Sequence, residues 1–110
     1  MFKYFFPLLV LIHGLLHLMG FAKAFDGNIT QLTRAIPKPL GVLWMMAALL
    51  FIATAVLLFL KKDMWTIFAV IAVIVSEVLI ITVWADAKYG TLINVMILLA
   101  VLWLLLLTVI

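Results

Sequence analysis

The chain has 110 residues, of which 71% are hydrophobic and 10% charged, and its mean hydropathy is +1.50. A soluble domain carries about 25% charged residues and about half apolar ones, so this composition excludes an ordinary soluble protein. The sequence contains no cysteine, which excludes disulfides and thiol chemistry within the chain. The net charge of +3 comes from cations at segment ends, where they anchor helices at lipid headgroups, and no nucleic-acid partner is expected.

Four segments are long enough to cross a bilayer, because a helix that spans the hydrocarbon core needs about 20 apolar residues. The first predicted span runs from about 5 to 22. We expect it to be retained rather than cleaved, because no small-residue cleavage pattern follows it. Gly14 and Gly20 within this span permit close contact with another helix.

A polar loop, 23–39, follows the first span. Ile29, Leu32 and Ile36 recur in it at helical spacing, which predicts a short helix that lies on the membrane surface. Two prolines, Pro37 and Pro39, close the loop.

The remaining predicted spans are 40–60, 64–85 and 91–110. The turn between the second and third spans is so short that these spans must run antiparallel. Gly90 suits a helix stop and Thr91 a helix N-cap. Of the large aromatic residues, Trp103 is expected to pack inside, and the others are expected at the membrane interfaces: Trp44, Trp65, Trp84 and Tyr89. The predicted fold is all-α, with residues 1–110 forming a single transmembrane domain, an antiparallel up-down bundle of four helices.

Two histidines stand inside the first span. His13 and His17 are four residues apart, so both imidazoles project from one helix face. His17 lies about 18 Å along its span, and Glu77 lies about as far along the third span, which runs in the same direction. If these spans touch, an imidazole and a carboxyl group can hydrogen-bond near the bilayer centre. Ionisable residues at that depth indicate a functional site.

Two further polar residues lie nearer the side of the polar loop, Asp86 and Asn94. Together with Glu77, His17 and His13 they predict a funnel that opens to that side and binds a ligand. On one continuous helix Asp86 points about 180° away from Glu77, so such a helix cannot aim both into one pocket. Each residue also has a structural interpretation: the histidines can bond backbone or hydroxyl groups, Glu77 can join two helices, and Asn94 can cap the fourth span.

Three cofactors are compatible with this cluster. A divalent metal would take His13, His17 and Glu77, although Gly14 stands where the zincin pattern has glutamate. One histidine can serve as an axial haem ligand. A quinone can accept hydrogen bonds from His or Glu, with its tail against apolar side chains.

Two segments, His17–Phe25 (HLMGFAKAF) and Trp84–Asn94 (WADAKYGTLIN), resemble those of small bacterial proteins in the broad DoxX-like group. The first helix departs from that group's Gly/Lys-rich pattern by its paired histidines. The resemblance implies a four-helix bundle in the bacterial inner membrane, in some relatives tied to quinone-linked oxidoreductases. It carries over no catalytic residue.

The predicted function is that of a small membrane protein whose polar pocket binds or passes a small ligand coupled to protonation. Two alternatives are a membrane subunit of a quinone-, haem- or metal-linked oxidoreductase and an accessory subunit without a site. Whether the protein is an enzyme stays open. We expect contact with the lipid bilayer, a homo-oligomer that gives the site more room, and both termini in the cytoplasm, because the short turn 61–63 carries two lysines.

Overall fold

The computed structural model describes residues 2–25 and 36–109. Within them the chain forms helices α1 (Phe2–Phe25), α2 (Lys38–Phe59), α3 (Trp65–Thr82), α4 (Trp84–Ala87) and α5 (Tyr89–Val109). Four of these described helices, α1, α2, α3 and α5, are long and apolar enough to cross a membrane. The protein is therefore an all-α integral membrane protein, as predicted. The surface helix predicted within the polar loop falls mostly on residues 26–35, outside the described residues.

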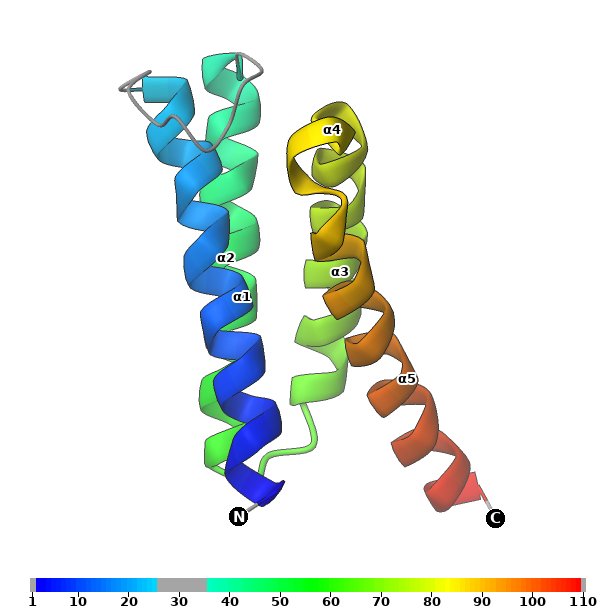
Figure 1. Ribbon diagram of the computed structural model, residues 1–110. Coiled ribbons are helices and arrows are strands. Elements are labelled where there is room, and N and C mark those ends of the chain that lie inside the picture. Colours follow the sequence, from blue (N-terminus) through cyan, green and yellow to red (C-terminus); the bar gives the residue numbers. More distant parts are fainter. Residues whose placement is uncertain (1, 26–35, 110) are drawn as a thin grey trace.

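The helices form two antiparallel pairs (Figure 1). Helix α1 packs along α2, and α3 packs against α5, while contacts between α2 and α3 join the two pairs. Helix α5 leans away from α3 toward its carboxyl end, so these two helices separate on the side of the chain termini. The short helix α4 forms the corner at the opposite end, on the side where α1 ends and α2 begins.

Small residues bring α1 and α2 into close contact. A Cβ atom at Gly14 would lie 2.7 Å from Phe51 Cβ and 3.2 Å from the Ala48 carbonyl oxygen. A Cβ atom at Gly20 would overlap the ring of Trp44. The close contact predicted from Gly14 and Gly20 is confirmed.

The corner between α3 and α5 differs from the prediction. The third span was expected to continue to residue 85, but α3 ends at Thr82, and Val83 leaves the helical conformation with φ −130° and ψ 43°. The chain then makes one turn of helix before α5 begins. Gly90 lies inside α5 rather than stopping a helix, because the break at Val83 already provides the change in direction.

Three tryptophan predictions were wrong. Trp44 and Trp65 are buried, with 4% and 8% of their surface exposed, and Trp65 packs edge-on against Phe6 with ring centroids 5.8 Å apart. Trp103 is 66% exposed because α5 leans outward. Trp84 and Tyr89 are exposed at the α4 corner, as expected of interfacial aromatics.

Candidate functional site

The two histidines of α1 are buried and point toward α3 and α5. His17 Nδ1 donates a hydrogen bond to the carbonyl oxygen of His13, at 2.8 Å. Because that carbonyl can only accept, Nδ1 carries the proton, and in a neutral ring Nε2 is an acceptor. It accepts from the Ser76 hydroxyl on α3, at 2.7 Å. The i, i+4 spacing thus orients His17 as well as placing both rings on one face.

Asn94 of α5 closes these bonds into a ring. Its amide nitrogen donates to Ser76 Oγ at 3.0 Å, and its Oδ1 accepts from His13 Nε2 at 2.9 Å. His13, His17, Ser76 and Asn94 therefore form a closed circuit that joins α1, α3 and α5, and we call these four residues the polar ring. Every donor in the polar ring meets an acceptor when both histidines are neutral.

Glu77 is attached to the polar ring from outside. Its Oε1 accepts from the Asn94 amide at 3.1 Å, and its Oε2 accepts from the Thr91 hydroxyl at 2.8 Å. The bond expected between His17 and Glu77 is therefore replaced by one to Ser76, a residue earlier, because Ser76 rather than Glu77 faces α1. Thr91, expected as an N-cap, instead joins α5 to α3.

Helix α2 supplies aromatic walls for the histidines. The ring of Phe51 contacts His13 and His17, with centroids 4.8 and 5.0 Å apart. The ring of Trp44 also lies close to His17, with centroids 5.2 Å apart. The Trp44 indole N–H is buried and has no hydrogen-bond partner among the described residues. The histidines are thus held by hydrogen bonds on one side and by ring contacts on the other.

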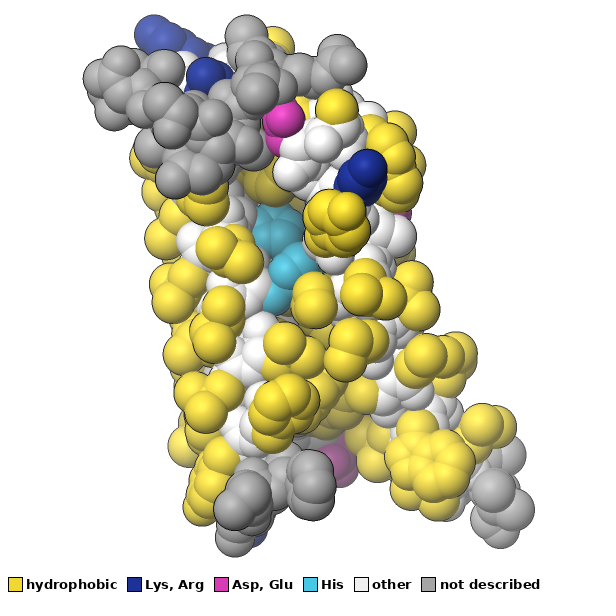
Figure 2. All heavy atoms as spheres, in the orientation of Figure 1, with side chains coloured by type: hydrophobic (Ala, Val, Ile, Leu, Met, Phe, Trp, Pro, Cys, Tyr) yellow, Lys and Arg dark blue, Asp and Glu magenta, His cyan; other side chains and the backbone are white. Residues whose placement is uncertain are grey.

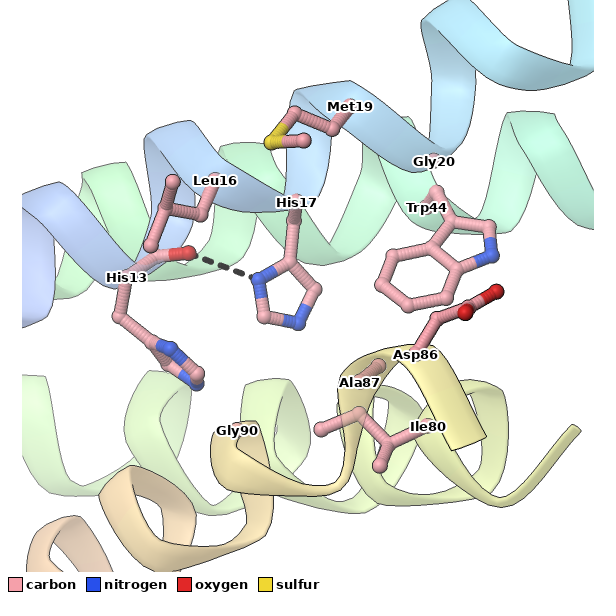
Figure 3. A pocket seen from close by; sticks show the side chains of 10 residues that line it. All are labelled: His13, Leu16, His17, Met19, Gly20, Trp44, Ile80, Asp86, Ala87 and Gly90. Atoms are coloured by element: carbon pink, nitrogen blue, oxygen red, sulfur yellow. Dashed lines mark hydrogen bonds between the residues drawn. The ribbon is translucent and has the colours of Figure 1, made fainter. Parts of the chain in front are cut away.

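A cavity of about 190 Å³ lies beside the polar ring, between the two helix pairs. Figure 2 shows the histidines at the bottom of a slot between α1 and the α4 corner, framed by hydrophobic side chains. Figure 3 shows that Asp86 and the nitrogen edge of Trp44 lie at one end of the cavity and the His13 ring at the other. The lining residues are His13, Leu16, His17, Met19, Gly20, Trp44, Ile80, Asp86, Ala87 and Gly90.

The five predicted site residues divide into two groups. His13, His17 and Asp86 line the cavity, whereas Asn94 and Glu77 lie behind it, attached through hydrogen bonds. Asp86 reaches the cavity because the break at Val83 separates its helix from α3, which removes the conflict with the direction of Glu77. Sequence reasoning did not place Ser76 and Trp44 in the site. The sequence feature that could have predicted Ser76 as a site residue is its position next to Glu77, an acid expected inside a membrane span.

A metal centre finds no support in this geometry. Within residues 2–25 and 36–109, no group of three His, Asp or Glu side chains is placed to hold a metal ion. Both ring nitrogens of His17 and one of His13 already form hydrogen bonds.

Comparison with protein-family models, curated proteins and solved structures finds no match. The resemblance to DoxX-like proteins stays a prediction. The function must therefore be argued from the site itself.

Proposed function

We propose that this membrane protein binds a small amphipathic molecule in the cavity beside the polar ring. The observation that carries the proposal is the cavity itself, about 190 Å³ of space with apolar walls and polar ends. Cavities of about 150 Å³ hold benzene, so this one suits a single ring or a head group of that size. Apolar walls with a few placed polar groups are typical of ligand sites.

The position of the slot indicates the route to the cavity. It lies along the side of the helices, and the side chains around it are hydrophobic (Figure 2). Leu16, on its α1 edge, is 56% exposed. A ligand dissolved in the membrane can therefore reach the cavity sideways, with its tail remaining among the lipids.

The histidines of the polar ring, which are neutral in the hydrogen-bond pattern described above, can couple ligand binding to protonation. A second proton on His17 would make Nε2 a donor and force the Ser76 hydroxyl to find another acceptor. The titratable groups around this pair are Glu77, reached through Asn94, and Asp86 across the cavity. Proton uptake would therefore rearrange the cavity wall, which supports a site whose ligand affinity depends on pH.

The test uses the four tryptophans of the chain as reporters. Protein labelled with 5-fluorotryptophan is titrated with p-xylene in detergent, and the ¹⁹F signal of Trp44 is followed. We expect a saturable shift of Trp44, while the exposed Trp84 and Trp103 report only partitioning into the micelle.

A matched pair of variants tests whether p-xylene binds in the cavity. Ala87→Phe places a phenyl group at the cavity wall, whereas Ala85→Phe adds the same group at an exposed position of the same short helix. Binding should be lost in Ala87→Phe and kept in Ala85→Phe. A Trp44 shift that never saturates, or that is equal in both variants, would refute the proposed site.

A further inference from the structure

Trp44 presents a hydrogen-bond donor at one end of the cavity. Its indole N–H is buried, has no hydrogen-bond partner among the described residues and lies on the edge of the ring that faces this end (Figure 3). The indole is held in place, because its ring packs directly on Gly20 and its centroid lies 5.2 Å from that of His17. A buried N–H without an acceptor is costly. A ligand therefore gains affinity by placing an acceptor at this end.

His13 presents an acceptor at the other end. The Asn94 amide nitrogen donates to Glu77, so its oxygen is the atom that faces His13, and His13 Nε2 must donate to it. The rings of His17 and Phe51 surround the imidazole, which disfavours a buried charge, and in the neutral ring Nδ1 carries a lone pair. Nδ1 has no hydrogen-bond partner in the described part of the chain, although only 5% of the His13 surface is exposed. A ligand therefore gains affinity by placing a donor at this end.

The two ends thus require opposite hydrogen-bonding groups. A carbonyl satisfies the indole N–H and brings no proton that needs a partner of its own, and a hydroxyl supplies the proton that His13 Nδ1 can accept. A quinone, with a carbonyl at each end, would leave Nδ1 without a donor. We infer that the cavity takes a neutral one-ring molecule with a carbonyl toward Trp44 and a hydroxyl toward His13, as in a 4-hydroxyphenyl ketone.

This inference rests on the binding function proposed above, so the experiment separates the two. Four probes of similar shape are compared: 4-hydroxyacetophenone carries both groups, 4-methylacetophenone only the carbonyl, 4-methylphenol only the hydroxyl, and p-xylene neither. Binding is followed by the ¹³C-labelled methyl signal of Met19, whose side chain lines the cavity. Affinities are expressed per mole fraction of probe in the micelle, which removes differences in partitioning. We expect 4-hydroxyacetophenone to bind at least about fivefold more tightly than either probe with one group, and p-xylene to bind most weakly.

Two variants assign each group of the probe to one end of the cavity. Trp44→Phe should bring the affinity ratio of 4-hydroxyacetophenone to 4-methylphenol close to one, and His13→Phe should do the same to its ratio to 4-methylacetophenone. Each ratio compares two probes in the same protein, so a change in cavity shape largely cancels.

A measurement on the wild-type chain keeps the inference testable if either variant fails to fold. In protein labelled with ¹⁵N-tryptophan, the indole proton of Trp44 should move downfield with 4-methylacetophenone, which offers it an acceptor, and not with p-xylene, which does not. The affinity ratios of the wild type and this shift then decide.

The possible failures differ. If the carbonyl or the hydroxyl adds less than about twofold to the affinity in the wild type, the inference is overturned and the proposed function stands. The same holds if both ratios survive their variants, or if the Trp44 indole proton does not respond to the carbonyl probes. Failure of all four probes to give a saturable Met19 shift that Ala87→Phe abolishes would refute the proposed function itself.

Discussion

Asn94 is the residue on which the buried hydrogen bonds converge. It donates to Ser76 and Glu77, accepts from His13, and is 2% exposed. Asn94→Leu would leave His13 Nε2 without its partner and would remove one of the bonds of Ser76 and of Glu77. Hydrogen bonds between membrane helices contribute on average about 0.6 and at most about 1.7 kcal/mol, so we expect this variant to lower the free energy of unfolding by about 1–2 kcal/mol.

The control for this prediction is Thr54→Val. Thr54 is equally buried, but its hydroxyl donates only to the Leu50 carbonyl of its own helix. A threonine hydroxyl bonded to the carbonyl four residues earlier adds little to a helix, so its replacement should change the free energy of unfolding by only about 0.5 kcal/mol. Unfolding by SDS in mixed micelles, followed by circular dichroism, measures both. Equal effects of the two substitutions would mean that the polar ring contributes nothing to holding the helices together.

For the buried site, the sequence predicted which residues take part better than it predicted which residues bond to each other. The helical period places His13 and His17 on one face, and a count of residues places Glu77 near their level. Successive residues on a helix point about 100° apart. To predict whether Ser76 or Glu77 bonds to His17, one must therefore know the rotation of α3 about its axis more closely than about 100°. That rotation depends on packing against α2 and α5, which a hydropathy pattern does not specify.

Among the elements, α1 and α2 depend on glycine at their contact. Gly14→Ala adds a methyl group 2.7 Å from Phe51 Cβ and 3.2 Å from a backbone carbonyl, neither of which can move without shifting a helix. Overpacking of this kind costs about 1–3 kcal/mol, and the helix propensity of alanine offsets only about 1 kcal/mol. We therefore expect a net loss of stability.

Gly90→Ala is the matched comparison. Its added methyl group would meet the Cδ1 atom of Ile80 at 2.8 Å, and this atom is the end of a flexible side chain that can rotate. The free energy of unfolding should therefore be unchanged or rise by up to about 1 kcal/mol, because alanine favours a helix more than glycine does. Measured in the same SDS titration, a Gly90→Ala variant less stable than Gly14→Ala would contradict the close α1–α2 contact.

The ends of the elements were harder to predict than their existence. Long apolar runs predict the four spans well, because a segment inside the bilayer must form a helix to satisfy its backbone hydrogen bonds. The residues from Thr82 to Tyr89 contain neither proline nor glycine, so no residue type there marks a break in the helix. The break at Val83 lets the chain turn back so that α5 can pack against α3. The same break places Asp86 at the cavity.

In the whole molecule, the cavity lies between α1 and the corner formed by α4 and the start of α5, where the helices face each other without close packing. Direct packing of α1 against α5 is slight, and the polar ring supplies much of the connection between α1 and the other pair. A bundle closed by apolar side chains would leave no space beside the histidines. The homo-oligomer expected from the sequence stays a prediction.

The arrangement of the spans also predicts which exposed residues share a side of the membrane. Lys62, in the turn between α2 and α3, and Lys88, after α4, are both exposed and lie at opposite ends of α3. Because the chain contains no cysteine, Lys62→Cys and Lys88→Cys each create a single labelling site. With both termini in the cytoplasm, an impermeant maleimide should label Lys88→Cys in intact bacterial cells and Lys62→Cys only after lysis. The reverse pattern would invert the proposed orientation and keep the fold, whereas labelling of both variants in intact cells would contradict α3 as a membrane span.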